Sequence, residues 1–194
     1  MVGELVEYAG AGGRSERATF WAAGAEGGKR AGVLLLDERD AFATRFVEQG
    51  FAVLVPRSAW SGAPDRAALA DIEAALAWFA KQRGVDASKL AVVGYARGGT
   101  LAFMLACTSR RVAAAVDIDG PVVYAELSAA RPAQPLEFAL NLSVPLLVVA
   151  REDEQLRRLR RLLEQGAKHV EFVERDEDGA RTISFLREVL EVED

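Results

Sequence analysis

Short apolar runs alternate with longer segments of helical periodicity along almost the whole of this 194-residue chain. Runs rich in Val, Leu, Ile and Ala are typical of strands that are buried on both faces. Because parallel neighbours can be joined only by long crossovers, a repeated order of strand then helix requires a mostly parallel sheet with helices on both faces. We therefore predict an α/β protein with a central sheet of about eight strands.

Turn and capping signals set the boundaries of these elements. Strands are predicted at Leu5–Tyr8, Thr19–Ala22, Gly32–Leu36, Ala52–Val55, Leu90–Val93, Ala113–Ile118, Leu146–Val149 and Val170–Val173. Helices are predicted at Ala41–Gln49, Arg66–Arg83, Gly99–Thr108, Glu154–Gln165 and Ala180–Val192. No repeat or linker divides residues 1–194, so we expect a single domain.

One long irregular stretch, residues 120–143, interrupts the alternation and contains three prolines and a short helical piece, Leu136–Leu140. A stretch that leaves the carboxyl end of a strand can roof a ligand crevice. It can equally be an ordinary surface excursion. The sequence favours neither.

The chain has one cysteine and one histidine, and these two counts limit its chemistry. Cys107 has no partner for an intramolecular disulfide, which suits a reducing compartment. His169 alone cannot supply a metal site that needs two imidazoles. We expect no metal and no other cofactor.

The charge balance is acidic, with 24 basic and 29 acidic residues and a net charge of -5. Without a basic tract, nucleic-acid binding is not expected. The arginines at 157, 158, 160 and 161 alternate with leucines, as on the solvated face of an amphipathic helix. No apolar run approaches the roughly 20 residues of a membrane span, and the N-terminus does not resemble a signal peptide. We therefore expect a cytoplasmic protein without a membrane partner, and its oligomeric state stays open.

The segment Gly94-Tyr95-Ala96-Arg97-Gly98 follows a predicted buried strand and precedes a predicted helix. It has the form of a nucleophile elbow, G-x-Nu-x-G, in which small residues flank a sharply turned central residue. Ala96 occupies the nucleophile position but has a methyl group where acyl transfer needs a hydroxyl or a thiol. The backbone N–H of Arg97 would belong to an oxyanion hole.

Several segments together resemble the dienelactone hydrolases, a branch of the α/β-hydrolase fold. The resemblance covers nearly the whole chain and rests on residues 85–99 around the elbow, 51–56 in a strand ending in proline, 35–38, and 144–153. It implies that Glu38 occupies the place of a glutamate beside the nucleophile. It also implies that Asp153 occupies the position of the triad acid.

The family's third triad member is a histidine in the loop before the C-terminal helix, and residues 174–180 contain none. His169 lies several residues too early to replace it. The two groups that make bonds and transfer protons are thus both missing. Three interpretations stay open: a noncatalytic homologue that binds a small molecule or a protein, a hydrolase whose nucleophile was replaced by alanine, and a noncatalytic structural or assembly subunit.

Other side chains at predicted strand ends suit binding. Arg57, Trp60, Tyr95 and Arg151 combine guanidinium and aromatic groups, which can hold a planar carboxylate by bidentate hydrogen bonds and stacking. The alternative is that Trp60 packs against the excursion and that Arg97 fills the space of a substrate. A small carboxylate-type ligand is therefore one possible partner.

Overall fold

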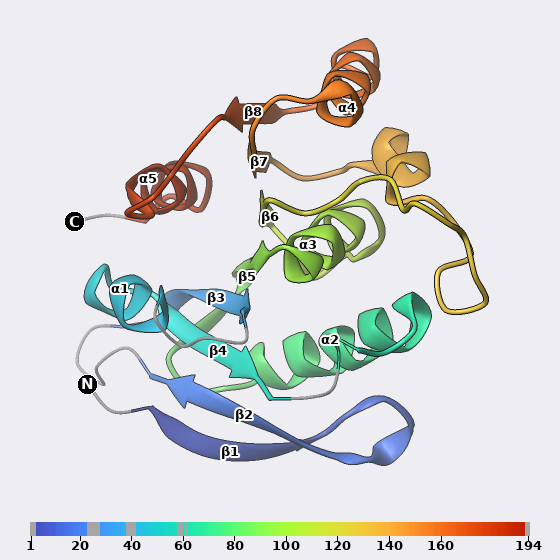
Figure 1. The fold of residues 1–194 in the computed structure, drawn as a ribbon. Helices are drawn as coiled ribbons and strands as arrows, with labels where there is room; N and C mark the ends of the chain where they lie inside the picture. The colour runs from blue at the N-terminus through green and yellow to red at the C-terminus, as the bar shows by residue number, and fades with distance from the viewer. Residues whose placement is uncertain (1–2, 23–27, 38–41, 58–59, 61, 193–194) are drawn as a thin grey trace.

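An eight-stranded sheet forms the centre of the protein in the computed structural model, which describes residues 3–22, 28–37, 42–57, 60 and 62–192 (Figure 1). The strand order is β1-β2-β4-β3-β5-β6-β7-β8. β1 and β2 form an antiparallel hairpin, β2 is antiparallel to β4, and the remaining neighbours are parallel. The strands are β1 Glu4–Ala9, β2 Ser15–Trp21, β3 Arg30–Leu36, β4 Ala52–Pro56, β5 Val85–Tyr95, β6 Ala114–Ile118, β7 Leu146–Val149 and β8 Val170–Val173.

Helices cover both faces of this sheet. They are α1 Ala43–Glu48, α2 Asp65–Phe79, α3 Arg97–Thr108, α4 Glu154–Gln165 and α5 Ala180–Val189. Side chains of α2, α3 and α4 join one buried cluster, and side chains of α1 and α5 join the other. Figure 1 shows the two helical layers on opposite sides of the strands. The predicted mostly parallel sheet with helices on both faces is confirmed.

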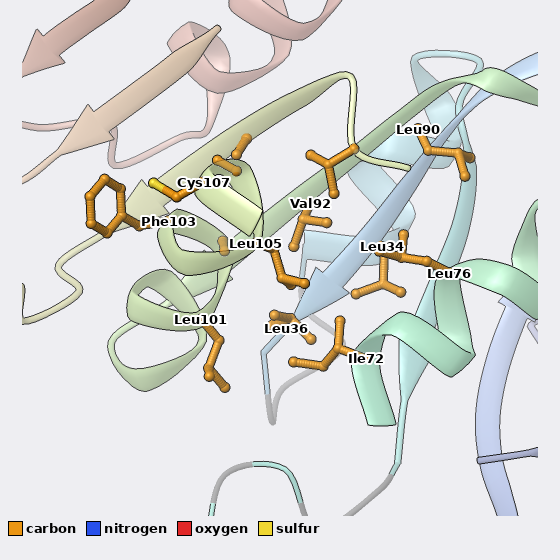
Figure 2. Close-up of a cluster of buried hydrophobic side chains, with 14 of the residues drawn as sticks. Leu34, Leu36, Ile72, Leu76, Leu90, Val92, Leu101, Phe103, Leu105 and Cys107 are labelled. Carbon is orange, nitrogen blue, oxygen red and sulfur yellow. The ribbon is translucent and has the colours of Figure 1, made fainter. Parts of the chain in front are cut away.

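Strand residues supply the two clusters alternately because neighbouring side chains on a strand point to opposite faces. Leu34 and Leu36 belong to the cluster with α2 and α3, whereas Val33 and Leu35 belong to the other. Figure 2 shows side chains of α2 and α3 converging on Leu34, Leu36 and Val92. Long runs of apolar residues in β3 and β5 are therefore explained by burial on both faces.

Most predicted boundaries agree with the structure to within a few residues, and those of β7, α4 and β8 agree fully. The largest differences are at β5, which begins at Val85 rather than Leu90, at β2, which begins at Ser15 rather than Thr19, and at the end of α2. That helix stops at Phe79, and turn residues then lead to Gly84, whose φ of 86° suits glycine. The sequence pattern does not predict the first part of β5 because residues 86–89, of which three are polar, are exposed or half-buried and break the apolar run.

The excursion 120–143 runs from β6 to β7 and packs mainly on helices. Its 3-10 helix Pro135–Asn141 buries Leu136 and Ala139 in the cluster that contains α3 and α4. The Gln134 side chain holds the backbone of Tyr124, accepting from its N–H and donating to its carbonyl. The excursion is thus anchored along much of its length.

Candidate functional site

The turn between β5 and α3 is built around Ala96, whose φ of 49° and ψ of -116° are unusual for a residue with a side chain. Its N–H donates to the Ile118 carbonyl at 2.8 Å, and its own carbonyl accepts from Thr100 N–H at 3.1 Å. A backbone of this kind costs about 1–3 kcal/mol and persists only where its surroundings impose it. The methyl of Ala96 therefore lies at a strained strand-to-helix turn.

Two glycines make this turn sterically possible. A Cβ added to Gly94 would lie 2.0 Å from the Gly98 carbonyl oxygen, and one added to Gly98 would lie 2.1 Å from the Leu36 carbonyl oxygen. Neither position can accept a larger residue without backbone movement. The small residues on either side of position 96 are thus required by close packing of α3 against β5 and β3.

A cavity of about 730 Å³ opens beside this turn, at the carboxyl ends of β5, β6 and β7. This is the edge where doubly wound sheets bind ligands. Three of the predicted site residues, Tyr95, Arg151 and Asp153, line it together. Ala96 and Arg97 are not among the described residues that line the cavity, although Tyr95, which precedes them, does line it. The other lining residues include Phe42, Asp119, Gly120, Pro121, Gln155 and residues 174–177.

Two acidic residues of the cavity wall cap helices. Asp153 accepts from Leu156 N–H at 2.7 Å and so caps α4. Asp176 accepts from Arg181 N–H at 2.9 Å and from Thr182 N–H at 2.8 Å, at the start of α5. Both carboxylates thus have a structural role that their position at helix N-termini explains.

Arg175 and Glu177 of the wall pair with each other at 3.6 Å, whereas three other charged groups of the described wall have no such partner. Within the described part of the chain, Arg151, Asp119 and Glu174 form no side-chain hydrogen bond or ion pair. Phe42 stacks on Tyr95 with ring centroids 5.0 Å apart and an interplanar angle of 28°. Among its described residues, the cavity therefore offers one unpaired guanidinium, two unpaired carboxylates and an aromatic surface to a ligand.

Arg97 turns away from the cavity toward the start of α2. Its Nη1 lies 2.9 Å from Asp65 Oδ1, and its Nη2 donates to the Ala63 carbonyl at 2.6 Å. The phenol of Tyr124 is buried beside this pair; burial first, and then the Asp65 carboxylate, raise the pKa of Tyr124 to about 12. Asp65 also donates its N–H to the Ala130 carbonyl. The pair thus ties the turn to α2 and to the excursion.

The remaining predicted site residues lie elsewhere or outside the described residues. Arg57 donates to Thr19 Oγ1 and lines a separate cavity of about 340 Å³ beside Arg14. Trp60 is buried in the hydrophobic cluster on the α2 side. Glu38 lies outside the residues that the structure describes, so its predicted place beside position 96 stays a prediction.

The histidine and the cysteine both lie away from the turn. His169 immediately precedes β8, and its carbonyl accepts from Leu146 N–H. It therefore lies at the amino ends of the strands, whereas the cavity lies at their carboxyl ends. Cys107 is buried near the end of α3 (Figure 2), and burial raises the pKa of its thiol to about 12. Neither side chain reaches the turn at Ala96.

A buried carboxyl group outside the predicted site residues lies against the same turn. Asp117 is fully buried in β6 next to Gly94 of β5, and its Oδ1 accepts from Gly120 N–H at 2.9 Å. Burial is the main cause that raises its pKa to about 8, and the charge of Asp119 adds to it. Asp117 is therefore held mainly as the neutral acid at neutral pH.

Sequence reasoning could have found part of what it missed. Asp119 and Glu174 follow the carboxyl ends of β6 and β8, so the rule that selected Arg151 also selects them. No local signal points to Phe42 or Asp65, because their contacts bring together segments more than 30 residues apart. In the described part of the chain, no group of three or more metal-ligating side chains is placed to hold an ion.

Comparison with known proteins bears on this geometry. The dienelactone hydrolase family model matches residues 57–170, more than half of the chain, and the match includes β5, the turn at Ala96 and Asp153. The chain belongs to the dienelactone hydrolase family. It carries that family's fold with an alanine at the strained turn.

Individual relatives of this dienelactone hydrolase family member are distant. A Yersinia pestis protein assigned as a carboxymethylenebutenolidase is 34% identical over 84 residues, which are 43% of this chain and only 31% of that protein. A Klebsiella pneumoniae structure assigned as a dienelactone hydrolase has a TM-score of 0.82 at 18% identity, with both chains fully covered. An esterase structure from Pyrococcus furiosus has a TM-score of 0.77 at 12% identity, covering 97% of this chain and 90% of the other. These structures show that the fold is that of α/β hydrolases.

The helices in the described part of the chain fall short of the requirements for a membrane span. None of its helices combines the length and the apolar character that crossing a bilayer requires.

Proposed function

We propose that this member of the dienelactone hydrolase family has lost hydrolytic activity and binds a small molecule in the cavity beside Ala96. The observation that carries the proposal is the methyl group at position 96, in a backbone strained as at a nucleophile elbow. The absence of histidine from residues 174–180 supports it, because acyl transfer also needs a general base.

The ligand that we propose is a small carboxylate-type molecule. Arg151 is exposed at the cavity wall, and a guanidinium binds a carboxylate through two parallel hydrogen bonds. The stacked rings of Phe42 and Tyr95 suit an unsaturated or aromatic body. Hydrogen-bond donors on the ligand would face Asp119 and Glu174, which otherwise repel an anion.

Loss of activity is tested by rebuilding the missing groups. We would measure hydrolysis of a small activated ester and of a butenolide lactone by the unchanged chain, by Ala96→Cys, and by Ala96→Cys with Glu177→His. Glu177 lines the cavity, whereas Asp178 does not, so Ala96→Cys with Asp178→His is the matched control. A general base within reach contributes about 10²–10⁴ in rate.

The proposal predicts no turnover by the unchanged chain and the largest gain in the variant with histidine at 177. Turnover by the unchanged chain that is abolished when Ala96 is replaced by a bulky residue would refute the loss of activity. Strong activity of Ala96→Cys alone would instead favour a hydrolase whose nucleophile was replaced by alanine.

Ligand binding is tested separately by thermal stabilisation. Benzoate, benzylamine and phenylalanine compare an anion, a cation and a zwitterion of similar size, and binding to the folded state raises the unfolding temperature. We expect benzoate and phenylalanine to raise the unfolding temperature of the unchanged chain. This stabilisation should disappear in Arg151→Gln and persist in Arg158→Gln, because Arg158 lies outside the cavity wall. A response to benzylamine alone would overturn the carboxylate assignment, and no response to any of the three would favour a structural or assembly role.

A further inference from the structure

Three arginines form one exposed surface on α4. Arg157, Arg158 and Arg161 are all exposed, whereas Leu156, Leu159 and Leu163 of the same helix are buried. Residues three and four apart on a helix are neighbours on its surface, with Cβ atoms about 5–6 Å apart. We call these three guanidinium groups the α4 arginine face.

Contacts among the three arginines do not stabilise the helix. Like charges at these spacings destabilise a helix by about 0.2–0.5 kcal/mol per pair. Cations stabilise the last turn of a helix through its dipole, and the last turn of α4 contains none. The arginines instead occupy the first half and the middle of the helix.

In the part of the chain that the structure describes, Glu154 and Glu164, which lie three or four positions from these arginines on α4, form no ion pair with them. Within the described residues, no ion pair or side-chain hydrogen bond involves any of the three arginines. Arg160 differs from them, because it stacks on Phe172 at 4.3 Å and pairs with Glu152 at 3.8 Å. One arginine of the run thus has a structural partner, and the other three present unpaired charge to solvent.

We propose that the α4 arginine face binds an acidic polypeptide segment of another protein. Guanidinium groups bind carboxylates in a bidentate way and are weakly hydrated, so they suit such an interface better than lysines. The surface has a single helical turn of positive charge on a chain whose net charge is -5. A short run of carboxylates complements it, whereas nucleic acid would require a longer basic track to release enough counterions.

The test uses the full chain and a fluorescein-labelled oligoglutamate peptide, with binding followed by fluorescence anisotropy at low and at physiological salt. Arg157→Gln, Arg158→Gln and Arg161→Gln are combined in one variant. Glutamine keeps the helix propensity of arginine, so the fold of α4 is retained. The matched control combines Arg66→Gln, Arg83→Gln and Arg110→Gln, three exposed arginines far apart in sequence.

We expect the α4 variant to bind the peptide about tenfold more weakly than the unchanged chain, and the control to bind almost as well. Replacing the same three arginines by lysine should cost about threefold, since charge is kept and bidentate geometry is lost. Absence of peptide binding at low salt, or equal losses in the variant and the control, would overturn the proposal. Tighter, α4-dependent binding of duplex DNA or of vesicles rich in anionic phospholipid would overturn the assignment to a polypeptide.

Discussion

The guanidinium of Arg97 lies 2.9 Å from the carboxylate of Asp65, and both side chains are largely buried. This ion pair joins the residue after the strained turn to the first residue of α2, more than 30 positions earlier. It also explains why Arg97 does not fill the cavity beside Ala96. The side chain that the sequence suggested as a plug is committed to a contact on the other side of the turn.

Breaking this pair on one side should be costly, because the remaining charge stays buried without its partner. We expect Asp65→Asn to lower the free energy of unfolding by about 3 kcal/mol, measured by urea denaturation. The double variant Asp65→Leu with Arg97→Leu should lose less than the sum of its single variants. Additive losses would mean that the two side chains contribute independently.

Because Ala96 is strained, replacing it by glycine should stabilise the protein, whereas the same replacement at an ordinary helical alanine should destabilise it. Ala96→Gly should raise the free energy of unfolding by about 1 kcal/mol, because glycine adopts a positive φ without a steric penalty. Ala67→Gly, at an exposed position inside α2, should lower it by about 1 kcal/mol. If both variants lose stability in urea denaturation, the turn is not strained.

Close packing around the turn predicts a large effect of a single methyl group. Gly94→Ala should destabilise the protein by at least about 3 kcal/mol, since its Cβ would lie 2.0 Å from the Gly98 carbonyl oxygen. Gly62→Ala is the control, because nothing lies within 4 Å of a Cβ added there. Comparable thermal unfolding midpoints for the two variants would contradict the packing argument.

Burial of Asp117 predicts that stability depends on pH. Its pKa is raised from 3.8 to about 8 in the folded protein, so the folded state holds a proton that the unfolded state releases between these values. The contribution of Asp117 to stability is therefore complete below about pH 4 and is lost progressively as the pH rises toward about 8.

The measurement is the free energy of unfolding at about pH 5 and about pH 8 for the unchanged chain and for Asp117→Asn. The decrease over this interval should be smaller in the variant, which cannot ionise at that position. Asp86→Asn is the control, because Ser88 hydrogen bonds lower the pKa of that half-buried carboxyl, so its effect on stability falls below this pH interval. If the free energy of unfolding decreases equally in Asp117→Asn and in the unchanged chain, Asp117 is not the source of the pH dependence.

Thiol chemistry offers a further prediction. Cys107 should react with a disulfide reagent only as fast as the protein unfolds, because it is buried and its pKa is raised to about 12. In Ala96→Cys, the second thiol, at the turn, should react with the reagent in the folded state. Cys107→Ser is the control and should remain unlabelled in all conditions, because it contains no thiol. Rapid labelling of the unchanged chain under native conditions would show that Cys107 is accessible.

Much of the architecture follows from the sequence alone because burial on two faces leaves a local record. Runs such as Leu146–Val149 must be apolar throughout to pack between two helical layers, and the leucines of α4 repeat at helical spacing for the same reason. The glycines around Ala96 and the absence of a hydroxyl, a thiol or a loop histidine there are likewise properties of the chain itself.

Only the tertiary structure decided which strand-end residues share a cavity. Tyr95, Arg151 and Asp153 meet at one edge, whereas Arg57 and Trp60 do not line that cavity, although all five follow or end strands in the sequence. The direction of Arg97 depends on Asp65, and the stacking of Tyr95 depends on Phe42; neither partner is near in sequence. Side-chain direction is set by such long-range contacts, which local periodicity does not encode.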